Sequence, residues 1–306
     1  DNIYQTNHAT FIFKLRQPNK PTLHLLIESG KRFHLTSYTY EKPQRPPTFC
    51  MALRKHLRNG RVTEIQQHEF ERLITIKVST REGDFQLICE LFGEGNIILV
   101  SPDNKILHAL TYRRMRDRNV LRGEKLQYPP PSGKNPYRVS RQDLDEVKKL
   151  MQLEIVKALT KFLSIGGLYA EEILHHAQVD KNTSCESLTN PRLDDIFNQL
   201  QEILSQVQSD DVKPHIVIDG EGKWIDVTPI PLSKYTGFQQ KSYKTMNEAL
   251  DEYYAKMTMK ERVEKASKEV EQELAKLKRV LQNQQKATEE LKQHIEKNRK
   301  IGDTIY

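Results

Sequence analysis

Residues 46–73, PPTFCMALRKHLRNGRVTEIQQHEFERL, decide how the first part of this chain folds. The segment 49–57 has one largely apolar side, because these residues recur at helical spacing: Phe49, Ala52, Leu53, His56 and Leu57. The pair Pro46-Pro47 suits a helix start, where a missing backbone N–H costs nothing. Asn59-Gly60 suits its end, because glycine reaches the left-handed conformation without strain. The stretch therefore predicts a helix that stops near residue 60.

Two strands are predicted after this helix. Val62 and Ile65 open the first, and the segment 70–78 forms the second, which carries a Glu71-Arg72 pair. Three cations lie on or beside the polar side of the helix: Arg54, Lys55 and Arg58. Because charged faces are the norm for amphipathic helices, a solvent-exposed face is one interpretation of these cations. A binding role is the other.

The composition describes a polar chain with a small core. Its 306 residues suit two or three structural units, and the 29% of charged residues suits long exposed helices beside a compact part. The net charge of +7 favours a polyanionic partner. We find no run of about 18 apolar residues that predicts a membrane span and no signal peptide, so a cytoplasmic protein is expected. Both ends, Asp1 and Tyr306, look like cuts in a longer protein.

Cysteine and histidine positions predict neither a disulfide nor a metal site. Cys50, Cys89 and Cys185 are widely spaced and lack metal-ligand spacing, so we interpret them as reduced, buried thiols. His175 and His176 are adjacent, and on a helix they would point about 100° apart. Motifs of serine, zinc and P-loop enzymes are also missing. The sequence therefore predicts no metal, no cofactor and no enzymatic chemistry.

Turn residues and alternating apolar residues predict two groups of strands, in residues 1–40 and 73–112. The turn at residues 93–96, Gly-Glu-Gly-Asn, resembles a phosphate-binding loop in composition. It lacks the following helix and the Lys-Ser/Thr of a P-loop, so we interpret it as a hairpin turn.

Residues 113–125, RRMRDRNVLRGEK, form the densest basic run of the chain. Its cations are Arg113, Arg114, Arg116, Arg118, Arg122 and Lys125. Arginine presents a planar fork to phosphate oxygens, so the run is either a phosphate-binding stripe or an ordinary solvated loop. The sequence leaves both open.

Residues 140–205 change to helical periodicity. Two short helices, 155–163 and 168–177, flank a Ser-Ile-Gly-Gly turn that contains Gly166 and Gly167. The pattern resembles a helix-hairpin-helix, in which a glycine turn presents backbone N–H groups to a phosphate. An ordinary helical hairpin is the alternative.

Beyond residue 210 the pattern returns to strands and then to one long helix. Residues 211–245 are expected to form a β-hairpin segment that packs back on the preceding parts. From 246 to 306 there is no proline, and seven apolar residues fit one a/d register: Val263, Val270, Leu274, Leu277, Leu281, Leu291 and Ile295. A helix this polar needs a partner helix, either in cis or in trans in a dimer.

The order of these motifs resembles the NFACT family. This family includes bacterial and archaeal RqcH proteins, often labelled fibronectin-binding protein A, and eukaryotic factors of ribosome-associated quality control. Matching blocks follow in the right order along nearly the whole chain: Pro46-Pro47, Phe49–Met51, Leu53–Leu57, Glu71-Arg72, Gly95–Leu99, Gly123, Tyr128–Pro131, and Gly302-Asp303-x-Ile305-Tyr306. Glu in place of Asp in the family's acidic-Arg pair suits an archaeal member.

The resemblance implies an α+β multidomain fold with four parts. The first is a β-rich, glycosylase-like sheet domain with a helix, whose first part is missing, and a helix-hairpin-helix domain follows it. A β-hairpin segment and the first helix of a coiled coil complete the chain. The parts span residues 1–137, 138–210, 211–245 and 246–306, in that order.

The resemblance implies a function in positioning tRNA. RqcH-like proteins bind a large ribosomal subunit that still holds a peptidyl-tRNA, and they recruit an aminoacyl-tRNA, typically alanyl-tRNA. The ribosome's own peptidyl-transferase centre then extends the stalled chain without mRNA. The acidic-Arg pair is needed for tRNA use, so Glu71 would hydrogen-bond bases of an exposed RNA loop while Arg72 takes a phosphate or stacks on a base. A surface salt bridge within the pair is the structural alternative.

Further contacts are expected from charge and from the glycine turn. Candidates for the tRNA backbone are Arg54, Lys55, Arg113, Arg114, Arg116, Arg118 and Arg122, and candidates for a phosphate are Gly166 and Gly167. Two other function classes stay open. The older family name suggests a surface adhesin for fibronectin, and the glycosylase-like architecture suggests a DNA-binding or DNA-repair module.

Overall fold

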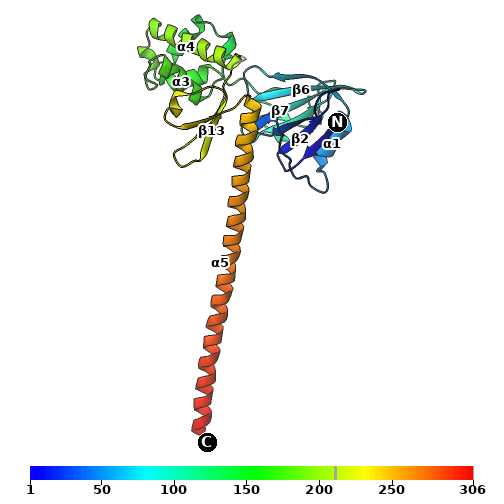
Figure 1. The fold of residues 1–306 in the computed structure, drawn as a ribbon, viewed down its shortest axis with the longest axis vertical. Coiled ribbons are helices and arrows are strands. Elements are labelled where there is room, and N and C mark those ends of the chain that lie inside the picture. The colour runs from blue at the N-terminus through cyan, green and yellow to red at the C-terminus, as the bar shows by residue number, and fades with distance from the viewer. Residues whose placement is uncertain (210–211, 306) are drawn as a thin grey trace. The chain divides into compact units, whose positions relative to one another are not determined.

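The computed structural model describes residues 1–209 and 212–305, and Figure 1 shows its elements in chain order. It divides into two units, Asp1–Tyr253 and Tyr254–Tyr306. The first unit holds every strand and all helices but the last, and the second holds most of a single long helix. Together the elements confirm a mixed α and β architecture.

The first sheet is an antiparallel meander in the order β1-β2-β3-β4, as the alternating residues predict. Its strands are β1 Asn2–Gln5, β2 Thr10–Leu15, β3 Leu23–Glu28 and β4 Arg32–Leu35. Phe11 and Ile27, which face each other across β2 and β3, are fully buried. The sheet therefore contributes one face to a core.

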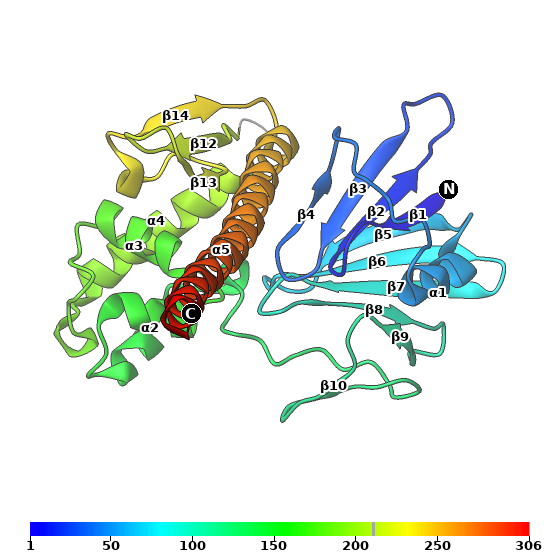
Figure 2. The same ribbon diagram turned by 90° about the horizontal axis from the view of Figure 1, so that it is seen from below.

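The second sheet is antiparallel in the order β5-β6-β7-β8-β9, so β5 and β9 are its two edges. Its strands are β5 Arg61–Gln67, β6 Leu73–Thr80, β7 Gly83–Glu90, β8 Asn96–Val100 and β9 Ile106–Ala109. Helix α1, Thr48–Leu57, lies beside the sheets, as Figure 2 shows. Its Leu53 is buried in the core that both sheets share. The helix predicted from residues 46–60 is confirmed.

Two details near this helix differ from expectation. Asn59, with φ of 62°, takes the left-handed conformation that we expected of Gly60. Gly60 is needed for space instead, because a Cβ there would lie 2.5 Å from Cγ1 of Val78. The Glu71-Arg72 pair lies in the turn between β5 and β6, because strand β6 begins only at Leu73.

The Gly-Glu-Gly-Asn turn joins β7 to β8 as a hairpin turn, as predicted. The β3–β4 turn packs directly against it: the N–H of Gly30 donates to the carbonyl of Glu90 at 2.9 Å. A Cβ on Gly95 would lie 2.0 Å from the nitrogen of Gly30. Glycine at 95 therefore serves the contact between the two sheets.

A helical part follows the sheets. Its elements are η1 Pro136–Arg138, η2 Gln142–Leu150, α2 Ile155–Phe162, α3 Gly167–His176, η3 Cys185–Ser187 and α4 Asn190–Gln208. Leu159, Ile173 and Leu200 are fully buried in its core. The expected helices are present, while the assignment of α2 and α3 to a helix-hairpin-helix stays a prediction.

A small third sheet packs on this helical part, in the order β13-β12-β14. Its elements are β12 His215–Ile218, β13 Trp224–Thr228, η4 Ser233–Tyr235 and β14 Gln239–Ser242. Val217, Leu232 and Tyr235 join the core of the helical part. Strand β14 was not expected, because its sequence QQKS contains no apolar residue.

The last element is the predicted long helix, α5 Met246–Ile305. Its first turns belong to the first unit, where Asp251 accepts hydrogen bonds from the hydroxyl of Thr36 at 2.6 Å and the N–H of Ser37 at 2.7 Å. In the second unit the a/d residues are at least half exposed, from 51% for Leu274 to 67% for Val270. The partner helix that would cover them stays a prediction.

The matched Gly302–Tyr306 block lies outside the residues whose side chains are described. Among the described residues, every helix is too short or too polar to cross a membrane.

Candidate nucleic-acid interface

The turn between β5 and β6, residues 68–72, contacts the segment that leads from the sheets to the helical part. We call this segment, residues 126–135, the linker. The ring of His68 stacks on Tyr128, with centroids 4.0 Å apart and planes 11° apart. The ring of Phe70 meets Tyr137 edge to face at 5.4 Å. The turn therefore packs aromatic side chains against Tyr128 near the start of the linker and against Tyr137 of η1, just beyond its end.

The carboxylate of Glu71 joins this turn to two other segments. Its Oε1 accepts the backbone N–H of Ser132 at 2.7 Å and the hydroxyl of Ser132 at 2.8 Å. The hydroxyl of Ser164 lies 3.0 Å from the same oxygen and 2.9 Å from the carbonyl oxygen of Gly133. Ser132 lies in the linker, and Ser164 lies in the loop between α2 and α3. We call this contact of Glu71 with Ser132 and Ser164 the junction.

Backbone contacts hold the linker against the α2–α3 loop. The N–H of Lys134 donates to the carbonyl of Phe162 at 2.7 Å, and the N–H of Ser164 donates to the carbonyl of Lys134 at 3.0 Å. A Cβ on Gly133 would lie 2.5 Å from the carbonyl carbon of Leu163. Glycine at 133 is therefore what lets the two segments approach.

A second carboxylate of the turn also binds the linker side. Oε1 of Glu69 accepts from Nη1 of Arg138 at 3.0 Å, and its Oε2 accepts from Nδ2 of Asn135 at 3.3 Å. These bonds, with that from Asn135 as the largest cause, lower the pKa of Glu69. Glu69 has a φ of 49°, so the backbone turns sharply at this residue.

An open groove of about 770 Å³ lies beside the junction, between the turn and the helical part. Its lining includes Arg138, Lys134, Lys161 and Phe162, together with Ser164 of the junction. Lys134 lies over the ring of Phe162, with Nζ 4.9 Å from the centroid. The volume is in the range of small-ligand sites, so the groove has room for a nucleotide.

The junction joins the residue next to Arg72 to the loop that precedes the glycine turn, and both Arg72 and the glycine turn were predicted as contacts. Arg72 is exposed, and its guanidinium has no hydrogen-bond or ion-pair partner among the described residues. Gly166 caps α3 and Gly167 is its first residue, only a few residues beyond Ser164. The first N–H groups of a helix lack partners within it, so this end can receive a phosphate.

The fold itself does not require glycine at 166 or 167. Neither residue has a positive φ, and a Cβ on either would meet no atom within 4 Å. The space that a side chain at either position would occupy is therefore open. This differs from Gly133 and Gly95, where packing excludes a side chain.

The basic run is divided between the core and the surface. Arg118 is buried, with Nη2 2.7 Å from Oε1 of Glu90 and only 3% and 5% of the two side chains exposed. The expectation that Arg118 contacts tRNA is therefore corrected, because its charge serves an internal ion pair. Arg113 lies 2.8 Å from Glu94. The exposed members of the predicted set are Arg114, Arg116 and Arg122.

The cations of α1 are also divided. Arg54 is half-buried and ties the helix to β1, since its Nε donates to the carbonyl of Ile3 at 2.7 Å. Lys55 is exposed. Burial above all, and then the charges of Arg122, His56 and Lys55, lower the pKa of His108 on β9. Lys55 and Arg122 thus lie around the β9 side of the sheet, whereas the turn at 68–72 follows β5.

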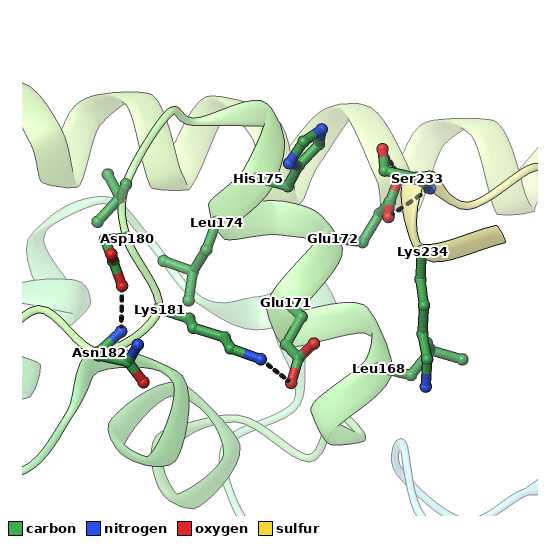
Figure 3. A pocket seen from close by; sticks show the side chains of 11 residues that line it. Leu168, Glu171, Glu172, Leu174, His175, Asp180, Lys181, Asn182, Ser233 and Lys234 are labelled. Atoms are coloured by element: carbon green, nitrogen blue, oxygen red, sulfur yellow. Dashed lines mark hydrogen bonds and ion pairs between the residues drawn. The ribbon is translucent and has the colours of Figure 1, made fainter. Parts of the chain in front are cut away.

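A second hollow, of about 450 Å³, lies beside α3 (Figure 3). Its buried Glu172 accepts the N–H of Ser233 at 2.8 Å and the hydroxyl of Ser233 at 2.9 Å, and it contacts Nε2 of His176 at 2.9 Å. The carboxylate thus joins α3 to η4. Within the described residues, no three His, Cys, Asp or Glu side chains gather as a metal site would need, and the absence of a cofactor stays a prediction.

The family follows from comparison with known proteins. The family described as NFACT N-terminal and middle domains matches residues 1–305. The chain belongs to the NFACT family. The predicted resemblance is confirmed over almost the full length of the sequence.

Three NFACT relatives show how much of a longer protein this chain covers. The chain is 35% identical over 302 residues to the archaeal Rqc2 homolog aRqcH of Methanocaldococcus jannaschii. This match covers 96% of the present chain and 44% of aRqcH. The identity is 26% to the Rqc2 homolog RqcH of Bacillus subtilis, with 88% and 47% covered. The identity to the human ribosome quality control complex subunit NEMF is 25%, and that match covers 100% of this chain and 30% of NEMF. The chain therefore spans less than half of each relative.

Two solved structures share the NFACT fold of this chain. The N-terminal part of the fibronectin/fibrinogen-binding protein from Streptococcus suis has a TM-score of 0.65 and 25% identity, and covers 83% of this chain and 91% of that one. The fibrinogen binding protein from Staphylococcus aureus has a TM-score of 0.66 and 25% identity, with 83% and 90% covered.

Sequence reasoning found Glu71, Arg72 and the two glycines, but it missed the residues that connect them. Ser132 and Ser164 lie 61 and 93 positions from Glu71 along the chain. Their one visible signal was that each is close to glycine, within the segments Pro-Ser-Gly-Lys and Ser-Ile-Gly-Gly. Nothing local in those segments points to a carboxylate on the β5–β6 turn.

Proposed function

We propose that this NFACT chain is the tRNA-binding part of a cytoplasmic ribosome quality control factor. The complete factor binds a large ribosomal subunit with a stalled peptidyl-tRNA and recruits an aminoacyl-tRNA, with alanyl-tRNA as the first candidate. The ribosome then adds residues to the nascent chain without mRNA. Relatives named as RqcH and as a ribosome quality control complex subunit support this role in general.

One observation carries the tRNA interface: the junction joins the residue next to exposed Arg72 to the loop that leads into the Gly166-Gly167 turn. The guanidinium can make paired hydrogen bonds to a phosphate or stack on an unpaired base. The N-terminus of α3 offers N–H groups and a positive dipole end to a second phosphate. Two separate contacts of this kind suit a folded RNA better than a single-point anion.

The exposed arginines of the basic run add contacts that do not depend on sequence. Arg114, Arg116 and Arg122 are candidates for the RNA backbone, as is Lys55 near Arg122. Such contacts raise affinity and make it dependent on salt. We assign general affinity for RNA to this surface, and selectivity between tRNAs to Arg72 and the glycine turn, whose segments the junction joins.

In this proposal the protein positions its partners and performs no chemistry of its own. Peptide bonds form at the ribosomal centre, so no cofactor or metal is needed. Helix α5 pairs with a partner helix through its exposed a/d residues, in cis or in a dimer, because an isolated helix of this length and polarity lacks a packed face.

The test is binding of the 306-residue chain to a tRNA pool and to duplex DNA of equal charge, at two salt concentrations. We expect the wild type to prefer tRNA and to enrich particular tRNAs. The Glu71→Ala/Arg72→Ala variant should lose this selectivity and keep a salt-sensitive background. Equal binding of tRNA and DNA by both proteins would contradict the proposal and leave only a generic polyanion surface.

A second candidate function is adhesion to host matrix proteins. The observation that favours it is the likeness to two solved structures, of a fibronectin/fibrinogen-binding protein and of a fibrinogen binding protein. Purified fibronectin tested beside the tRNA pool separates the two candidates. Saturable fibronectin binding that competes with neither tRNA nor DNA would support adhesion, and its absence beside selective tRNA binding would exclude it for this chain.

A further inference from the structure

We infer that Glu71 is a positioning residue for the tRNA interface, and that Ser132 and Ser164 are two further positioning residues acting through it. This rests on the proposed function, because it concerns how that interface is held. It also divides the acidic-Arg pair: Arg72 touches the nucleic acid, and Glu71 sets where the glycine turn of α3 stands. The sequence alone suggested that both members of the pair touch RNA.

The hydrogen bonds of Glu71 are the first argument. The N–H and the hydroxyl of Ser132 lie 2.7 and 2.8 Å from its Oε1, and the same hydroxyl is 3.1 Å from Oε2. The Ser164 hydroxyl lies 3.0 Å from Oε1 and 2.9 Å from the carbonyl oxygen of Gly133, so its one proton is shared between these two acceptors. A carboxylate oxygen has about two acceptor sites, so Oε1 is fully used within the protein. A base that bound to Oε1 would have to displace one of these serine donors.

Charge is the second argument. A carboxylate facing a phosphate-binding surface repels its ligand unless hydrogen bonds hold it elsewhere. Glu71 points at the N–H and hydroxyl groups of Ser132 and Ser164, and hydrogen bonds to a charged acceptor are about twice as strong as neutral ones. The arrangement suits a structural anchor better than a contact for polyanionic RNA.

The position of Ser164 gives the third argument. It lies two residues before Gly166, and its own N–H donates to the carbonyl of Lys134 in the linker at 3.0 Å. Fixing Ser164 to the residue next to Arg72 therefore fixes the start of α3 relative to the guanidinium. A small misplacement of groups that bind one ligand together can cost a large part of their joint effect.

The test combines tRNA affinity with a double-mutant cycle in the 306-residue chain. The variants are Ser132→Ala/Ser164→Ala, Glu71→Ala and the triple variant. The matched control is Ser187→Ala, which removes a hydroxyl that donates to the carbonyl of Ser184 at 2.8 Å elsewhere in the helical part. Amide hydrogen exchange of residues 132–135 and 162–166 reports whether the linker and the loop stay together.

We expect the double serine variant to lose about tenfold in tRNA affinity and the control to lose less than about twofold. Glu71→Ala should add less than about twofold to the double serine variant, because both changes break one contact. Amides of residues 132–135 and 162–166 should exchange faster in both, while those of the sheets stay protected. Glu71→Gln, which keeps an acceptor at the same place, should retain most of the affinity.

Wild-type affinity of the double serine variant, or full additivity with Glu71→Ala, would overturn the inference, because Glu71 would then act on the RNA directly. Loss of affinity in Glu71→Gln as large as in Glu71→Ala, with protected linker amides, would overturn it as well. If the double serine variant does not fold, the comparison of Glu71→Gln with Glu71→Ala decides alone. Unchanged tRNA binding by Arg72→Ala would instead refute the proposed function, so the two failures differ.

Discussion

The basic run and the β5–β6 turn beside the junction use their arginines in opposite ways. The run is the densest in arginine, yet Arg118 is buried against Glu90 and Arg113 pairs with Glu94. The β5–β6 turn carries one arginine, Arg72, and leaves it exposed. The number of arginines in a stretch of sequence therefore does not measure how many of them a ligand can reach. Ion pairs with carboxylates elsewhere in the chain decide which arginines stay accessible.

The largest effect should come from removing the buried cation of the run. Arg118→Ala leaves Glu90 unpaired in the core, so the free energy of unfolding should fall by about 3–5 kcal/mol. Urea denaturation measures it. The matched control is Arg114→Ala, an exposed arginine, which should change stability by less than about 0.5 kcal/mol. Equal stability of the two variants would remove the contrast between core and surface within the run.

On the junction side, the closest approach between segments is at Gly133. In Gly133→Ala the new Cβ would lie 2.5 Å from the carbonyl carbon of Leu163, which is too close for two carbon atoms that are not bonded. Stability should fall by roughly 1–3 kcal/mol, the usual cost of overpacking. Thermal denaturation beside Gly220→Ala, where a Cβ meets no atom within 4 Å, checks this. A Gly133→Ala variant as stable as the control would mean that the linker and the loop can separate freely.

Gly167 should behave in the opposite sense. Gly167→Ala adds a Cβ in open space at the first residue of α3, so stability should stay equal or rise by up to about 1 kcal/mol. If a phosphate approaches this backbone, tRNA affinity should nevertheless fall several-fold, by a rough order of 1 kcal/mol. Filter binding and denaturation on the same preparation test both parts. Unchanged affinity would place the phosphate elsewhere.

The smallest expected effect is a change in one pKa, and it concerns Lys134, which lines the groove. Lys134 forms ion pairs within the protein, whereas Arg72 is exposed. Its Nζ lies 3.1 Å from Asp143, and hydrogen bonds from Ser140 above all, then from Lys134, lower the pKa of Asp143 from 3.8 to about 2. A lowered acid pKa means that the stabilisation is present above pH 4 and is lost as the pH falls toward 2.

An NMR titration of the Asp143 carboxyl checks this assignment. Ser140→Ala should raise the pKa toward 3.8, and Lys134→Ala should raise it less, because the hydroxyl of Ser140 is the larger cause. A pKa that stays near 2 in Ser140→Ala would show that the hydroxyl of Ser140 does not hold the carboxylate.

Local pattern predicted much of the fold. Helix α1 and the strands of the first two sheets follow from apolar spacing and turn residues, which act within a few positions. Strand β14 could not be predicted, because pairing with β12 rather than its own sequence makes it a strand. The pair at 71 and 72 fell outside β6 for a related reason: pairing of β6 with β7 begins at Leu73.

The candidate site was predictable only in pieces. Arg72 came from a family pattern and the glycine turn from helical periodicity, whereas the link between their segments depends on contacts between positions 71, 132 and 164. The burial of Arg118 depends on Glu90, which lies on a different strand. Sequence patterns report neighbours along the chain, and both of these facts concern neighbours in space.

The most direct test of the proposed interface compares two exposed arginines, one from each region. Arg72→Ala and Arg114→Ala remove the same charge, so their effects on nonspecific binding should be alike. We measure the tRNA affinity and the tRNA species bound by each variant at one salt concentration. The proposal predicts that Arg72→Ala loses selectivity and about tenfold in affinity, while Arg114→Ala keeps its selectivity and loses less than about threefold. Equal losses in the two variants would contradict a specific role for the junction.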